Sequence, residues 1–351
     1  MLIGSSTCKT STTPQPADCN VGYHQCDYDN TICCMDTTSH DFVWEIDTLG
    51  IYGSYLNDVA IVDENNIWVV GNIETDEGEY NAAHWDGSEW ELIGIMSNTL
   101  NLYSIFSFSE NDIWVTDTSS PIHWDGNEWT LYHLQNMGIH VSVNHLWGTS
   151  SSDMYFVGLQ GAIVHYDGTD FVQMESGTNV KLKDVNGTQD GEHVFTVGWD
   201  YSGESVALEL DHSNWNIISS SNNFVPQNGN YGKIQTVDLI SDTANFATRA
   251  GLVKYNYHTK VFSLQYSDLD YFSYFSFTES LSNSENDILL VGLWFAFLHY
   301  NGVGWYSDFT ILNYYGDGNI YAKGADFKDN FAVVVGYCCG GGHAIVGRGY
   351  R

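Results

Sequence analysis

Positive charge is scarce in this sequence. The 351 residues contain 11 Lys and Arg against 44 Asp and Glu, a formal net charge of −33, and Arg249, Arg348 and Arg351 are the only arginines. A surface this acidic repels phosphate groups, so it argues against nucleic acid as a partner and against docking on anionic membranes. The same acidity suits calcium, although acidic residues also simply solvate surface turns.

Proline and long apolar runs are also scarce. Only 4 prolines stand beside 34 glycines, a balance that favours many short strands joined by tight glycine turns. No run approaches the roughly 18 apolar residues of a membrane span, so we expect no transmembrane segment. A P-loop, a GxGxxG fingerprint, a GxSxG elbow and an HExxH pair are all missing, so no common catalytic signature is present.

Cysteine is missing from the long middle of the chain. Five of the seven cysteines lie in the first 34 residues, and the other two are Cys338 and Cys339. This distribution predicts a Cys-, Ser- and Thr-rich segment over residues 1–41, stapled by disulfides, in a bacterial protein at the cell surface, in the periplasm or outside the cell. A zinc site near His24 is the alternative, but the spacings do not match paired CxxC ligands.

A repeat runs through the rest of the chain. An apolar strand such as 67–71 (IWVVG) is followed by His84-Trp85-Asp86-Gly87 and then by Trp90. The pattern returns at His123, His165 and His299, and the glycines that end these strands recur about every 44 residues, a spacing in the range of propeller blades. Asp-Gly between apolar runs is a strong hairpin signal.

These units predict an all-β, seven-bladed β-propeller over residues 42–351. Each unit reads as four strands, and the expected inner strands are 56–61, 102–106, 143–147, 182–185, 234–237 and 320–322. The seventh unit runs out of chain after its third strand. We therefore expect the unpaired strand at 42–48 to supply the outer strand of the last blade and to close the ring, which removes free sheet edges.

The repeat resembles the tryptophan-rich propeller repeats of uncharacterised secreted proteins and lipoproteins in Bacteroidetes- and Ignavibacteria-like bacteria. The residues that carry the resemblance are 56–59 (LNDV), 65–71 (NNIWVVG) and 84–87 (HWDG). The resemblance implies the propeller fold and an exported location, and it implies no activity. The Asp-Gly-x-x-Trp turns also look like the Asp-boxes of sialidases, but His84, His123 and His165 replace the usual Ser, so sialidase chemistry is not carried over.

Residues that recur at the same position in several blades are poor candidates for a single site. We interpret the repeated histidines as a turn or packing device, and the repeated tryptophans as core between blades. Non-repeating residues near the channel are better candidates: Asp58, Asn144, His145 and Asp184 come from different inner strands and are expected to converge on the axis.

The convergence of these four residues suggests a metal site. Carboxylate and amide oxygens from Asp58, Asn144 and Asp184 suit calcium, with His145 and Asp184 as catalytic groups on a metal-polarised ester or lactone. This set is similar in residue types to the calcium-dependent propeller lactonases of the paraoxonase and gluconolactonase type. The alternative is that polar residues hydrate a water-filled channel.

Variable loops on a rigid scaffold are the usual place for binding. Trp199, Tyr201, Trp294 and Phe295 lie in such loops and are candidates for an aromatic patch that binds a small molecule, glycan or protein; alternatively, Trp294 and Phe295 continue a buried strand. Three functions follow: an extracellular or cell-surface binding propeller without catalysis, a calcium-dependent hydrolase with its site in the channel, and a carbohydrate-active enzyme.

Overall fold

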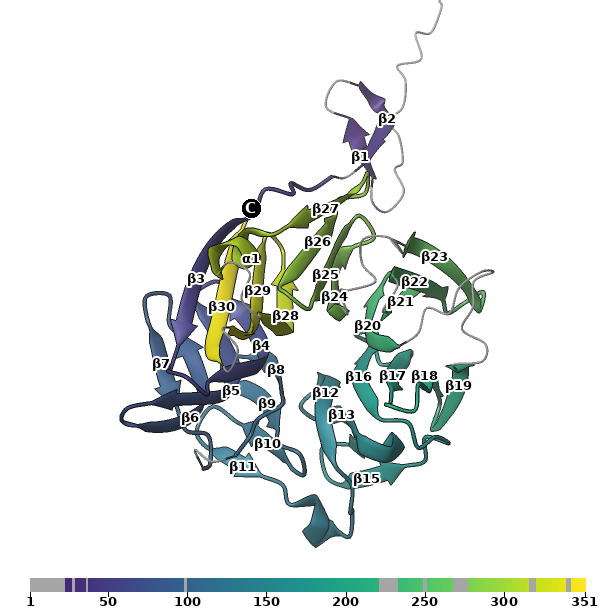
Figure 1. Cartoon of the computed structure of the whole chain (residues 1–351). Helices are drawn as coiled ribbons and strands as arrows, with labels where there is room; N and C mark the ends of the chain where they lie inside the picture. The colour runs from purple at the N-terminus through teal and green to yellow at the C-terminus, as the bar shows by residue number, and fades with distance from the viewer. Residues whose placement is uncertain are drawn as a thin grey trace, which may run out of the picture.

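Seven four-stranded antiparallel sheets surround a central axis in the computed structural model of the chain, so the fold is the seven-bladed β-propeller that the repeat predicts (Figure 1). The structure describes residues 23–26, 29–35, 37–97, 100–220, 233–248, 251–267, 277–315, 320–338 and 342–351. None of the helices in these ranges has the length and apolar character needed to span a membrane.

Each blade runs outward from an inner strand at the axis. Blade 1 contains β4 (Tyr55–Asp63), β5 (Asn66–Thr75), β6 (Gly78–Trp85) and β7 (Trp90–Ile93); blade 2 contains β8 (Ser104–Ser109), β9 (Asp112–Thr116), β10 (Pro121–Trp124) and β11 (Trp129–Leu131); blade 3 contains β12 (Val143–Ser150), β13 (Asp153–Gly158), β14 (Ile163–Tyr166) and β15 (Phe171–Met174). Blade 4 contains β16 (Leu182–Gly187), β17 (Val194–Trp199), β18 (Ser205–Asp211) and β19 (Asn214–Ser220); blade 5 contains β20 (Ile234–Ile240), β21 (Thr243–Thr248), β22 (Gly251–Asn256) and β23 (Val261–Ser267). Blade 6 contains β24 (Phe277–Ser284), β25 (Asp287–Gly292), β26 (Ala296–Tyr300) and β27 (Trp305–Asp308); blade 7 contains β28 (Tyr321–Lys328), β29 (Phe331–Cys338), β30 (His343–Tyr350) and β3 (Val43–Leu49).

The last blade is closed by the N-terminal strand, as predicted. Strand β3 pairs antiparallel with β30 from Val43 opposite Tyr350 to Leu49 opposite Ala344, and the purple β3 lies beside the yellow β30 in Figure 1. The indole of Trp44 adds a contact to the neighbouring blade, because its Nε1 donates to Asp308 Oδ2 at 2.9 Å. Chain segments some 300 residues apart therefore complete one sheet.

The glycine that ends the second strand of a blade has a steric role. A Cβ at Gly71 would lie 2.2 Å from the carbonyl oxygen of Tyr55, and one at Gly158 would lie 2.0 Å from that of Ser142. The inner strand therefore approaches the second strand more closely than any side chain permits. This contact explains why the repeat keeps glycine there.

The repeated histidines are a turn and packing device, as the sequence suggests. His84, His123 and His165 stack on an aromatic ring of their own blade, with centroids 4.3–4.6 Å apart. Each also contacts a polar side chain at the start of the second strand through Nε2, at distances of 2.7–2.9 Å: Asn66, Asp112, Asp153 and, for His299, Asp287. The repeated histidine therefore holds the turn between the first two strands of its blade in place.

Several elements differ from the sequence prediction. The repeat requires an inner strand in the sixth unit, but no residue range was predicted for it, because Thr278, Glu279, Ser280 and Ser282 make β24 mostly polar; helix α1 (Thr310–Tyr315) was not expected. Short 3-10 helices η1 (Leu134–Met137) and η2 (Leu159–Gly161) interrupt the loops of blades 2 and 3.

The predicted segment 1–41 contains a small hairpin, β1 (Tyr23–Cys26) and β2 (Asp29–Met35). Cys26, Cys33 and Cys34 lie on these strands, whereas Cys8, Cys19 and Cys339 lie outside the described residues. Disulfide pairing in this segment stays a prediction.

Candidate functional site

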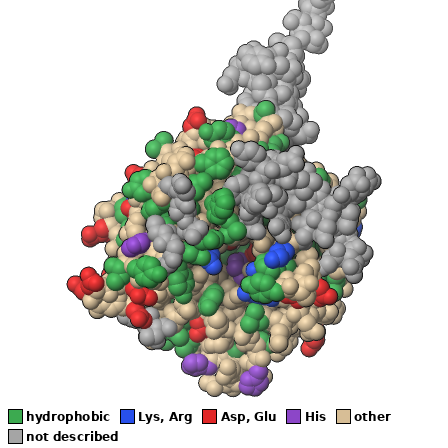
Figure 2. All heavy atoms as spheres, viewed as in Figure 1, with side chains coloured by type: hydrophobic (Ala, Val, Ile, Leu, Met, Phe, Trp, Pro, Cys, Tyr) green, Lys and Arg blue, Asp and Glu red, His purple; other side chains and the backbone are tan. Residues whose placement is uncertain are grey.

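One face of the propeller holds the starts of all seven inner strands, and we call it the mouth face. Because neighbouring strands of a blade are antiparallel, the loop from the second to the third strand and the connection into the inner strand also lie on this face. Figure 2 shows Lys and Arg side chains, in blue, gathered around a central hollow, while red carboxylates lie mostly toward the edge of the molecule.

Four lysines gather at this mouth, and we call them the lysine rim: Lys181, Lys183, Lys233 and Lys323. Lys183 is the second residue of inner strand β16 and Lys323 the third residue of inner strand β28, and Lys181 and Lys233 directly precede β16 and β20. They are four of only eight lysines in the chain. Within the described ranges, none of the four forms an ion pair with a carboxylate, although Lys260, Arg348 and Arg351 do.

An aromatic ring supports the rim. The Nζ atoms of Lys233 and Lys183 lie 3.4 Å and 4.3 Å from the ring centroid of Trp199. The Trp199 indole is 9% exposed, and its Nε1 donates to Gln235 Oε1 at 2.7 Å, which fixes the ring. Cation–π contacts of this kind stabilise an ammonium group by about 0.5–2 kcal/mol, so Trp199 holds two charges in place that no carboxylate neutralises.

Burial, and in part the crowding of like charges, lowers the pKa values of three rim lysines. Burial, together with the positive charges of its three rim neighbours, lowers the pKa of Lys183 to about 8. Burial and the charge of Lys323 lower the pKa of Lys181, and burial lowers that of Lys323. A bound anion would relieve this repulsion, since an opposite charge favours the protonated amine.

Below the rim, the channel contains a cavity of about 350 Å³ lined by acidic residues. Burial raises the pKa of Asp58 to about 6, and burial with the charge of Asp184 raises that of Asp238 to about 8. The pKa of Glu279 lies well above its usual range, because the carboxyl is buried and faces four other acidic side chains. Asp238 is therefore mostly protonated at neutral pH.

Several channel carboxylates join neighbouring blades. Asp58 Oδ2 accepts hydrogen bonds from Ser104 Oγ at 2.8 Å and from the amide of Ile105 at 2.9 Å. Asp184 Oδ2 accepts from the amide of Val237 at 2.7 Å and from Thr236 Oγ1. Each bond links the inner strand of one blade to that of the next, so these carboxylates also serve the closure of the ring.

The structure brings three of the four predicted channel residues together. Asp58, His145 and Asp184 line the cavity, and His145 Nδ1 lies 3.2 Å from Asp184 Oδ1, close enough for a charge contact but not aligned for a hydrogen bond. Asn144 is not among the lining residues, and its Oδ1 is buried without a hydrogen-bond partner among the described residues. No group of three His, Cys, Asp or Glu side chains in the described ranges is arranged to hold a metal ion.

The predicted aromatic residues fall into two places. Trp199 and Tyr201 meet edge-to-face at 5.5 Å at the end of β17, and Tyr201 is 97% exposed. Trp294 and Phe295 lie in the β25–β26 turn of blade 6, where Phe295 is 1% exposed and packs in the core, whereas Trp294 is 44% exposed. The pair around Trp199 therefore belongs to the rim.

Sequence reasoning missed the lysine rim and the channel residues Asp238, Glu279 and Asp326. The signal for the rim was available: scarce lysines occupy matching positions at the starts of inner strands in three blades. The signal for Glu279 was hidden, because its strand has no clear apolar pattern.

The fold and the mouth can be compared with known proteins. No protein-family model matches the sequence, and no curated protein matches it. Among solved structures, YCF48 bound to D1 peptide is 16% identical with a TM-score of 0.66, over 90% of this chain and 98% of that chain. Virginiamycin B lyase from Staphylococcus aureus is 9% identical with a TM-score of 0.68, over 89% and 100% of the two chains. YCF48 from Cyanidioschyzon merolae is 12% identical with a TM-score of 0.61, over 86% and 98%. Identities this low establish a shared fold and nothing finer.

Proposed function

We propose that the protein is a binding propeller that holds an anionic ligand at the lysine rim. The observation that carries this proposal is the gathering of four lysines, without carboxylate partners in the described ranges, at one mouth of a chain with net charge −33. A propeller of similar fold, YCF48, has been solved bound to D1 peptide, which supports binding as a role for this architecture.

The physical basis is the unfavourable electrostatic energy of several ammonium groups held close together at the rim. The partly buried ammonium groups repel one another, and burial together with this repulsion lowers the pKa of Lys183. An anion seated among them gains charge-assisted hydrogen bonds, worth about 1.5–3 kcal/mol each, and removes the repulsion. The acidic outer surface repels the same anion, so binding is confined to the mouth.

Calorimetric titration with citrate, a small anion with three carboxylates, tests the proposal. We expect Lys183→Gln to weaken citrate binding by about tenfold or more, since one charged hydrogen bond of that strength is lost. Lys328→Gln is the matched control, because Lys328 lies at the opposite end of the same strand, β28, as Lys323 and donates to the carbonyl of Val62 instead. Equal losses in the two variants, or no binding by the wild type, would refute the proposal.

We further propose that the protein acts outside the cytoplasm of a bacterium. The support is the cysteine-rich segment 1–41 and the acidic surface, both of which suit an exported protein. Free-thiol counting on non-reduced protein checks this: about one thiol is expected, and five or more would contradict a disulfide-stapled segment.

A calcium-dependent hydrolase in the channel is the competing proposal. The contact between His145 and Asp184 favours it, since a histidine beside a carboxylate is a common base arrangement. Against it, Asp58 already accepts hydrogen bonds at both oxygens, which leaves less of its charge for a metal. Melting temperatures in excess calcium and in chelator separate the two: a clear rise with calcium favours the hydrolase.

A further inference from the structure

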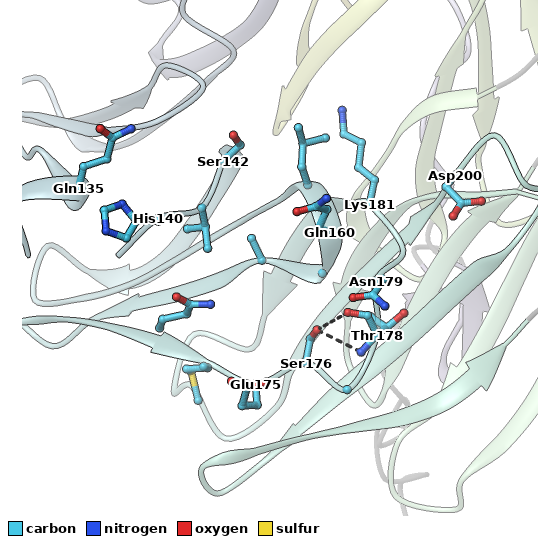
Figure 3. Close-up of a pocket in the computed structure, with 17 residues that line it drawn as sticks. Gln135, His140, Ser142, Gln160, Glu175, Ser176, Thr178, Asn179, Lys181 and Asp200 are labelled. Atoms are coloured by element: carbon cyan, nitrogen blue, oxygen red, sulfur yellow. Dashed lines mark hydrogen bonds between the residues drawn. The ribbon is translucent and has the colours of Figure 1, made fainter. Parts of the chain in front are cut away.

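A groove on the mouth face adjoins the lysine rim. It has a volume of about 870 Å³ and is formed by the connections at 135–142 and 173–181, by η2 and by Asp200. Lys181 belongs to both the groove and the rim, so the two are continuous (Figure 3). We call it the polar groove, and its defining residues are Gln135, Ser142, Gln160, Thr178, Asn179 and Lys181.

Several side-chain amide groups that are available for hydrogen bonding line this groove. Among the described residues, the side-chain amides of Gln135, Gln160 and Asn179 make no hydrogen bond to protein, although each offers two donors and an acceptor. Figure 3 shows Gln160 between Gln135 on one side and Asn179 on the other, with the Lys181 side chain extending upward in the view. Side-chain amides match the donor and acceptor of a peptide group.

The backbone of η2 is constrained where it carries Gln160. Gln160 has φ 55° and ψ 37°, a left-handed conformation that residues other than glycine rarely adopt. The next residue, Gly161, has φ 70°, and a Cβ there would lie 2.1 Å from the carbonyl oxygen of Thr178. The turn is therefore docked tightly on the opposite wall, and it holds the backbone of Gln160 at the groove.

Charge and shape narrow the class of ligand. Among the described residues that line the groove there is no Trp, Tyr or Phe, so these residues offer no stacking surface of the kind that a sugar ring would use. Glu175 and Asp200 also line it and repel further acidic groups, whereas Lys181 attracts one at the inner end. The ligand that fits carries its negative charge at one end and an uncharged, hydrogen-bonding chain behind it.

We propose that the polar groove binds an extended peptide whose terminal carboxylate is held at the lysine rim. The side-chain amides of Gln135, Gln160 and Asn179 pair with the peptide backbone, and Lys181 joins the other rim lysines on the carboxylate. This inference rests on the proposed function, because it requires the rim to take the anion.

Three probes separate the groove from the rim: citrate, a hexapeptide of Ala and Ser with a free carboxyl end, and the same hexapeptide amidated. Gln160→Gly is the sharpest variant, because it removes the amide while glycine readily keeps the left-handed backbone. Asn179→Ala is a second groove variant, and Gln189→Ala, an exposed glutamine outside the groove, is the control.

We expect Gln160→Gly and Asn179→Ala each to weaken binding of the free-acid hexapeptide about tenfold and to leave citrate binding unchanged. We also expect the amidated hexapeptide not to bind the wild-type protein. If citrate binds but neither groove variant alters hexapeptide affinity, the groove proposal is wrong and the rim proposal stands. If the amidated peptide binds as tightly as the free acid, the carboxylate is not held at the rim and the peptide proposal is wrong. If neither citrate nor the hexapeptide binds, the proposed function itself is wrong.

Discussion

At the scale of single residues, environment assigns different roles to similar side chains. Lys183 and Lys260 are both lysines beside aromatic rings, but Lys260 lies 2.7 Å from Glu209 Oε1, whereas Lys183 has other lysines as its charged neighbours. The first is an ion pair between a half-exposed lysine and a buried glutamate. The second has no carboxylate partner among the described residues, and such groups cluster at functional sites.

The titration of Lys183 gives a pH dependence of binding. Its pKa is lowered from 10.5 to about 8, so the amine is mostly charged at pH 7 and mostly neutral at pH 9.5. We therefore expect citrate affinity to fall severalfold between these two pH values, measured by calorimetry at constant ionic strength. Lys183→Arg keeps its charge throughout this range, so its affinity should fall less; an identical decline in both proteins would contradict the role of Lys183.

At the scale of strands, the closing blade depends on side chains from its neighbour. Arg351 follows β30 of blade 7, and its guanidinium donates to both oxygens of Asp287 at the start of β25 in blade 6, at 2.8 Å and 2.5 Å. Although burial opposes ionisation, hydrogen bonds from His299, Arg351 and Asn283 lower the pKa of Asp287 to about 2. The side chains are 2% and 6% exposed, so each charge depends on the other.

Removing one partner of this buried pair should therefore be costly. We expect Asp287→Ala to lower the free energy of unfolding by about 3–5 kcal/mol, since Arg351 is left buried and unpaired. Asp112→Ala is the matched control: Asp112 occupies the same slot in blade 2 and contacts His123, but it faces no arginine and its side chain is 31% exposed. Urea unfolding of both variants checks this, and equal losses would show that the arginine pair adds nothing.

The sequence predicted elements better than it predicted the site. Period and glycine spacing identify seven blades because every blade must bury the same kind of core, and the strand at 42–48 identifies the closure because one blade lacked a strand. The residue range of strand β24 was not predicted because the face of the strand toward the channel is polar, since Glu279 and Ser280 line the channel. The lysine rim was not predicted because its lysines come from three blades, and only the closed ring of blades places Lys323 near Lys183.

At the scale of the whole molecule, the arrangement of the blades makes the distribution of charge uneven. The ring brings the starts of seven inner strands to one small mouth, so a few lysines at matching positions become a concentrated positive site. The remaining surface carries most of the negative charge. The same geometry places the polar groove beside the rim, since the loops of neighbouring blades share that face.

Zero-length carbodiimide coupling of citrate, mapped by mass spectrometry, tests the central claim most directly. The reagent joins a carboxylate to an amine only when the two are in contact, and all eight lysines of the chain serve as internal comparisons. The account predicts coupling at Lys183 and Lys233, with Lys181 and Lys323 next. Coupling spread evenly over the lysines, or concentrated at Lys254, Lys260 or Lys328, would contradict an anion site at the lysine rim.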